Sequence, residues 1–107
     1  MRHRFRYASY DLRERQAGDR VIVNLRGYAA RLANVLLVNE RNFWRYRGGL
    51  PFEYLGGLCR RPPVEFAVPR SGHHYVAMDL GGRSGRVRGA VKVIPRTSGK
   101  TEKVRAS

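Results

Sequence analysis

Residues 64–93 read VEFAVPRSGHHYVAMDLGGRSGRVRGAVKV, and this stretch decides the fold class. Apolar side chains recur there at every second position, which is the period of a half-buried β-strand. The three alternating runs lie at 64–68, 76–80 and 87–93. Turn residues separate them, namely PRSG at 69–72 and the glycines of 81–85. The segment predicts three strands, and we expect the last two to form a hairpin.

The same period of two continues toward the N-terminus. Residues 21–25 alternate between apolar and polar, and residues 34–38 form a nearly continuous apolar run that suits a central strand. Phe52 and Tyr54 are expected to form another short strand, which ends at the Gly-Gly pair of residues 56–57.

The alternation slips close to the N-terminus. Phe5 and Tyr7 share one parity, whereas Tyr10 and Leu12 share the other. A β-bulge adds one residue to a strand and shifts its parity. We therefore expect a bulge or bend near residues 8–9, which would turn all four side chains inward.

One segment departs from the period of two. Residues 39–46 read NERNFWRY, with Asn39 as a candidate N-cap and with Phe43 and Tyr46 spaced i, i+3. This pattern predicts one or two helical turns, closed by the glycines at 48–49. The face opposite the two aromatic residues would carry Arg41, Trp44 and Arg45.

These elements add up to an all-β fold. We expect a single compact β-sandwich or jelly-roll-like domain of about six to eight short strands with one short helical turn. The length of 107 residues leaves room for one domain, and a hydrophobic content of 42% is enough for a core. The domain is expected over residues 1–95, followed by a basic, flexible tail over residues 96–107 that lacks periodicity.

The charge of the chain is strongly positive. Lys and Arg number 22 against 8 Asp and Glu, which gives a formal net charge of +14. Such a charge attracts polyanions without specificity, and Arg suits bidentate phosphate contacts. An excess of Arg over Lys can also follow from a GC-rich coding sequence. Nucleic acid or another polyanion is therefore one expected partner, and a protein is another.

Other features of the sequence narrow the class of protein. A single cysteine, Cys59, excludes an internal disulfide framework. The longest aliphatic run covers residues 35–38, far short of a membrane span, and the N-terminus has no apolar secretory segment. We expect a cytoplasmic protein without a membrane partner. No motif points to a cofactor or a metal, and the oligomeric state stays open.

Several short motifs together resemble a known family. They are Tyr10-Asp11-Leu12, Gly18-Asp19, Asn42-Phe43, Gly56-Gly57, Pro63-Val64, Pro69-Arg70-Ser71-Gly72-His73 and Val76-Ala77-Met78-Asp79-Leu80-Gly81-Gly82. Over roughly residues 5–94 the chain resembles the bacterial family called domain of unknown function 1883. His74 departs from it, because an aromatic residue is expected after His73.

The resemblance implies a compact all-β sandwich that stands alone or is fused to other domains. Some members of the family precede Toll/interleukin-receptor-type domains, which implies a sensing or targeting module. The family has no assigned catalytic residues, so the resemblance carries none over to this chain.

The strongest binding candidate is the helical segment with Arg41, Trp44, Arg45 and Arg47. An exposed Trp beside Arg can stack on a nucleobase or a sugar while the Arg neutralises phosphate. Alternatively, Trp44 plugs the end of the sandwich and the arginines are simply solvated.

The glycine-rich segment at 81–86 is a second candidate, because its backbone amides could cradle an anion together with Arg83 and Arg86. The plainer alternative is a hairpin turn that needs only positive φ angles.

His73 is a candidate ligand-binding residue. On a strand, His73 and His74 point to opposite faces and cannot chelate one ion. A hydrolase that uses His73 with Ser71 or Cys59 is the alternative, with the distant Asp11 as a possible third member.

These observations lead to three expectations about function. The first is a non-catalytic binding or sensing module for an anionic or polymeric ligand or for a protein partner. The second is the small hydrolase built on His73. The third is a structural interaction subunit that docks through a sheet edge or through the surface around Trp44.

Overall fold

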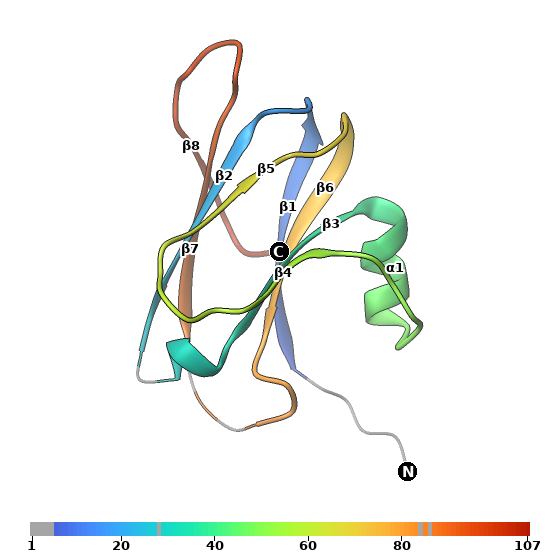
Figure 1. Cartoon of the computed structure of the whole chain (residues 1–107), viewed down its shortest axis with the longest axis vertical. Coiled ribbons are helices and arrows are strands. Elements are labelled where there is room, and N and C mark those ends of the chain that lie inside the picture. The colour runs from blue at the N-terminus through green and yellow to red at the C-terminus, as the bar shows by residue number, and fades with distance from the viewer. Residues whose placement is uncertain (1–5, 28, 84, 86) are drawn as a thin grey trace.

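The computed structural model describes residues 6–27, 29–83, 85 and 87–107. Within these ranges, eight strands form two antiparallel four-stranded sheets. The strands are β1 (Tyr7–Arg15), β2 (Arg20–Arg26), β3 (Asn34–Asn39), β4 (Leu55–Leu58), β5 (Val64–Ala67), β6 (Gly72–Asp79), β7 (Arg88–Ile94) and β8 (Glu102–Val104). One sheet has the order β1-β6-β3-β4 and the other β5-β2-β7-β8 (Figure 1). The all-β sandwich expected from the sequence is confirmed.

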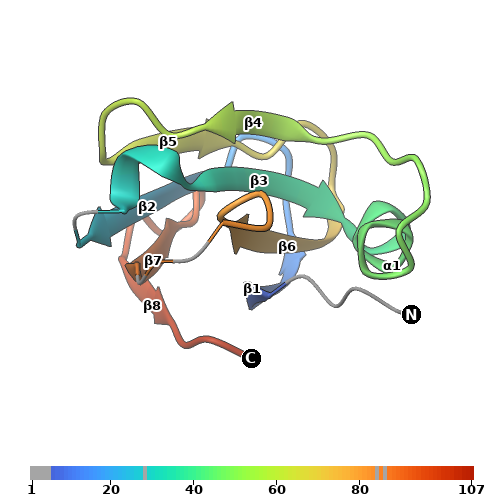
Figure 2. The same ribbon diagram turned by 90° about the horizontal axis from the view of Figure 1, so that it is seen from below.

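Two short helical elements complete the chain. They are the 3-10 helix η1 (Ala30–Leu32) and the α-helix α1 (Glu40–Arg47). The two sheets face each other, and α1 lies on the side of the first sheet that points away from the second (Figure 2). Within the described ranges, no helix is long and apolar enough to span a membrane.

The core fills the space between the sheets. Alternating residues of five strands point into it, and all of them are buried: Tyr10, Leu12, Val21, Val23, Leu25, Val35, Leu37, Val76, Met78, Val91 and Val93. Each apolar side chain removed from water in this way contributes roughly 1.5–3 kcal/mol. The strands predicted at 21–25, 34–38, 64–68 and 87–93 all belong to this sandwich.

A second apolar cluster lies outside the first sheet, under α1. Phe43 and Tyr46 of the helix pack on Leu36, Val38, Tyr75 and Ala77. The strands β3 and β6 are therefore buried on both faces. This explains the unbroken apolar run of residues 34–38, because a strand covered on both sides needs no polar face.

The hairpin expected between the last two alternating runs is wrong. β6 pairs with β1 and β3 in the first sheet, whereas β7 pairs with β2 and β8 in the second. The glycine-rich connection between them therefore crosses from one sheet to the other. Since β6 is hydrogen-bonded on both sides, no edge is left on which β7 could fold back.

The strand expected at Phe52 and Tyr54 is also wrong, because β4 begins only at Leu55 and includes both glycines at which the expected strand would end. Gly56 has φ +104°, and a Cβ there would collide with the carbonyl oxygen of Val35. A glycine is needed at this position so that β4 can pair closely with β3.

The irregularity near the N-terminus lies further along than expected. Tyr10 and Leu12 point into the core, whereas Tyr7 points to the opposite face and packs on the cluster under α1. The register shift falls between Asp11 and Arg13, and Arg13 has φ 63°. The expected bulge near residues 8–9 is therefore wrong, because strand alternation alone separates these side chains. Phe5 lies outside the described residues.

The expected unstructured tail needs correction as well. Residues 102–104 form β8, which pairs with β7, and Val104 packs against the core. Glu102 pairs with Arg15 at 3.0 Å, and the backbone N–H of Ser107 donates to the Ser9 carbonyl at 2.7 Å. Three residues are too few to show a period, which is why the sequence pattern misses this strand.

Candidate functional site

Helix α1 is held on the first sheet by its N-cap and by two buried rings. The Asn39 side chain accepts a hydrogen bond from the Asn42 backbone N–H at 2.9 Å, as predicted for an N-cap. Phe43 and Tyr46 are buried, and the Tyr46 hydroxyl donates to Asp79 Oδ2 at 2.6 Å. Burial and the neighbouring Asp79 carboxylate both raise the pKa of Tyr46, so its hydroxyl keeps the proton that makes this bond. The helix is a fixed platform.

The outer side of the platform presents Arg41, Trp44 and Arg47, which we call the α1 surface. These residues are spaced i, i+3, i+6 and therefore follow one another along the helix. The Trp44 side chain is 53% exposed, so it does not plug the sandwich. The Arg47 guanidinium lies 4.9 Å from the Trp44 ring centroid, within cation–π range. Arg41 is exposed, and no ion pair involves it in the described part of the chain.

Arg45, which was expected on the same face as Arg41 and Trp44, serves the loop after the helix. Its guanidinium donates to the Pro51 carbonyl at 3.3 Å, and its own carbonyl accepts from the Leu50 backbone N–H at 2.9 Å. Arg45 is partly buried. Arg47 takes the position beside Trp44 that the sequence pattern gave to Arg45.

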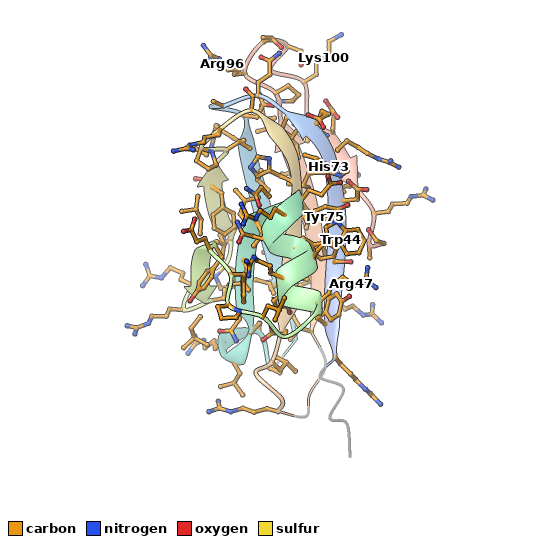
Figure 3. The ribbon with its side chains drawn as sticks, turned by 90° about the vertical axis from the view of Figure 1, so that its right-hand side faces the viewer. Trp44, Arg47, His73, Tyr75, Arg96 and Lys100 are labelled. Carbon is orange, nitrogen blue, oxygen red and sulfur yellow. The ribbon has the colours of Figure 1, made fainter. Side chains whose placement is uncertain are left out.

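A row of stacked rings leads from the α1 surface to His73. The Phe43 and Tyr75 rings are nearly parallel with centroids 4.0 Å apart, and the Tyr75 and His73 rings are stacked at 4.8 Å. Figure 3 shows Arg47, Trp44, Tyr75 and His73 following one another along the molecule. The packing of α1 on β6 brings these residues together. Their spacing in the sequence does not reveal this contact.

The His73 imidazole lies between two carboxylates. Its Nε2 is 2.6 Å from Asp11 Oδ1, and its Nδ1 is 3.2 Å from Glu40 Oε2. The contact with Asp11 is a hydrogen bond, whereas the contact with Glu40 is an ion pair only when the ring carries a charge. Partial burial alone would raise the pKa of Asp11, but the Arg13 backbone N–H and the His73 ring outweigh it and hold that pKa below its usual range. Burial, then the Asp11 and Glu40 carboxylates, raise the pKa of Tyr75.

The residues of the hydrolase alternative are only partly brought together. Asp11 does contact His73, across 62 residues of sequence. The Ser71 hydroxyl, however, accepts a hydrogen bond from the Ala17 backbone N–H at 3.1 Å. Cys59 is buried in the core, and burial raises the pKa of its thiol, which disfavours the thiolate nucleophile.

The glycine-rich segment after β6 forms a separate feature. The Gly81 backbone N–H donates to Asp79 Oδ1, and the Arg83 backbone N–H donates to the Leu80 carbonyl. Both amides thus already have acceptors, one of them a carboxylate. Arg83 lines a recess of about 500 Å³ at this end of the sandwich, whereas Arg86 lies outside the described residues.

The acidic side chains leave most of the positive charge uncompensated. Six of the eight already have a protein partner: Asp11, Asp19, Glu40, Glu65, Asp79 and Glu102. In the described part of the chain, the arginines that form ion pairs are Arg13, Arg15 and Arg20. The remaining arginines there have no carboxylate partner, although Arg45 and Arg96 donate to backbone carbonyls.

Comparison with known proteins gives a family without an assigned activity. The model of the family described as Domain of unknown function (DUF1883) matches residues 5–97, so the chain belongs to this family. The matched region ends before β8. No curated protein and no solved structure shows a significant match.

Proposed function

We propose that this member of the DUF1883 family is a non-catalytic binding module for single-stranded nucleic acid, which it binds at the α1 surface. The observation that carries the proposal is the Trp44 ring, 53% exposed and flanked by the Arg47 guanidinium at 4.9 Å. Exposure of an apolar aromatic face to water is unfavourable, and a ligand that covers the face removes this cost. A nucleobase offers a flat face of matching size.

The surface combines the two interactions that single-stranded nucleic acid needs. A base can stack on Trp44, and Arg41 and Arg47, one helical turn to either side, can bind the phosphates that flank it. Contacts of this kind do not read the edges of the bases, so we expect little sequence preference. The net charge of +14 adds long-range attraction that weakens with salt.

The rigidity of α1 supports this role. The helix is anchored by Phe43 and Tyr46 on its buried side. The hydrogen bond from Arg45 to the Pro51 carbonyl fixes the loop that follows the helix. Trp44 therefore does not need to be ordered when a ligand binds, which lowers the entropic cost of association. With nucleic acid as its ligand, the protein would act in the bacterial cytoplasm.

Binding of a fluorescein-labelled oligothymidylate, followed by fluorescence anisotropy, tests the proposal. Stacking on one aromatic ring contributes about 1–3 kcal/mol, so Trp44→Ala is expected to weaken binding by about tenfold or more. Leu58→Ala is the matched control, because Leu58 on β4 has the same 53% exposure. If both variants bind like the wild type, the α1 surface is not the binding site.

A further inference from the structure

A groove of about 590 Å³ lies beside the first turn of α1. Its walls come from that turn, from the adjoining ends of β1, β3 and β6, from the residues just before β4 and from the turn between β5 and β6. Its lining includes Glu14, Glu40, Arg41, Glu53, Tyr54 and Arg70, with His73 and His74 beside them. Trp44 and Arg47 are not among its lining residues, so the groove is distinct from most of the α1 surface.

The charge of the groove differs from that of the whole chain. Three of the eight acidic residues line it, against two arginines. Glu14 and Glu53 are the two acidic side chains without a hydrogen bond or an ion pair in the described part of the chain. The groove thus collects the free carboxylates of a protein with a net charge of +14, which makes it a poor site for a polyanion.

His74 offers a further polar atom to the groove. His74 lines the groove although it is only 4% exposed, and its Nδ1 is bonded to the Gly72 carbonyl at 2.9 Å. Its Nε2 has no partner among the described residues, where every fully enclosed side-chain polar atom has one. The Nε2 atom is therefore not fully enclosed, and it is the polar atom that His74 can offer to a ligand in the groove.

We propose that this groove binds a neutral oligosaccharide. Carboxylates only accept hydrogen bonds and guanidinium groups only donate them, whereas each sugar hydroxyl does both. A simple cation would leave Arg41 and Arg70 unpaired, and a simple anion would leave the Glu14 and Glu53 carboxylates unpaired. A chain of hydroxyl groups satisfies all of these side chains at once, and His74 Nε2 with them.

Tyr54 supplies the apolar contact that such a ligand needs. Its side chain is 51% exposed, and its ring leans on Phe52 with the centroids 5.1 Å apart, which holds it in position. The C–H face of a pyranose ring can pack on an exposed aromatic face, while its hydroxyls reach the polar lining. Tyr54 is the exposed tyrosine among those that the structure describes.

Backbone amide NMR of the full chain, titrated separately with maltohexaose, cellohexaose, laminarihexaose and chitohexaose, tests the proposal. At up to about 10 mM sugar, an excess over the millimolar Kd of a shallow site, at least one of them is expected to shift the amides of residues 53–55 and 71–74 in a saturable way. Tyr54→Ala and Glu53→Gln are expected to weaken that binding by about tenfold, whereas Trp44→Ala leaves it unchanged.

Other outcomes overturn the proposal. Absence of saturable shifts with all four sugars does so, and so do shifts that neither Tyr54→Ala nor Glu53→Gln reduces. Because both residues are exposed, each variant keeps the fold, which its dispersed amide spectrum verifies. Binding of the sugars does not depend on Trp44, so this result and the nucleic-acid result can fail independently.

Discussion

The Arg47 guanidinium lies 4.9 Å from the centroid of the Trp44 ring, on the exposed side of a helix whose other side is buried. This contact does two things at once. It fixes the orientation of the most exposed aromatic surface of α1, and it brings a positive charge next to it. The arrangement is the physical basis of the proposed nucleic-acid site.

Charge reversal at the two ends of the α1 surface tests whether the site is local. Arg41→Glu combined with Arg47→Glu is expected to weaken oligothymidylate binding about tenfold more than Lys100→Glu combined with Lys103→Glu. Both pairs change the net charge by the same amount, and Lys100 lies at the far end of the molecule from Arg47 (Figure 3). The comparison uses anisotropy at one fixed salt concentration. Equal losses would mean that only the total charge matters.

The bond between Tyr46 and Asp79 is expected to stabilise the platform. Tyr46→Phe removes the donor of a 2.6 Å hydrogen bond to a carboxylate under α1, and such a loss costs about 1–3 kcal/mol. The free energy of unfolding, measured by urea denaturation, should fall by that amount. The control is Tyr54→Phe, whose hydroxyl belongs to a half-exposed ring. Equal stability of the two variants would contradict the role given to Tyr46.

Asp11 makes part of the stability dependent on pH. Its pKa in the folded chain lies below the usual value, because the Arg13 N–H and the His73 ring outweigh the effect of burial. The folded state therefore binds fewer protons at this group than the unfolded state does, and the stabilisation is lost as the pH falls through the lowered pKa. The free energy of unfolding of Asp11→Asn should accordingly be lower than that of the wild type at about pH 5. This difference between the two proteins should be smaller at about pH 3.

Urea denaturation of both proteins at the two pH values measures this gap. Asp11 is partly exposed, so the difference at the higher pH is expected to stay below about 1 kcal/mol. Glu14→Gln, an exposed neighbour on β1, should show no comparable narrowing. If the free energies of unfolding of Asp11→Asn and the wild type differ by the same amount at both pH values, the role given to Asp11 is contradicted.

The sequence predicts most strands because period two is a local signal. It predicts α1 for the same reason, since the Asn39 cap and the Phe43–Tyr46 spacing lie within eight residues. It fails at β4, where Gly56 lies within the strand and permits close pairing with β3 instead of marking a strand end. It also fails for the partner of β7, because both edges of β6 are already paired with β1 and β3, which are distant from it in the sequence.

The features of the candidate site likewise divide into those that local sequence predicts and those that depend on the fold. Exposure of Trp44 opposite Phe43 follows from helical spacing within one segment. The contact between His73 and Asp11 depends on the register of β1 against β6, which a bulge at Leu12 shifts by one residue. The groove draws its walls from β1, β3, α1, the approach to β4, the turn before β6 and the start of β6, so only the folded chain reveals it.

The most direct test of the proposed function is the fluorescence of Trp44, the single tryptophan of the chain, during titration with oligothymidylate, oligouridylate and heparin. Stacking of a base on Trp44 predicts saturable quenching by a nucleic acid that persists at about 150 mM salt, and a smaller change with heparin. Small changes of equal size with all three polymers, abolished by the same salt, would contradict a site at Trp44 and leave only a general attraction to the charge of +14.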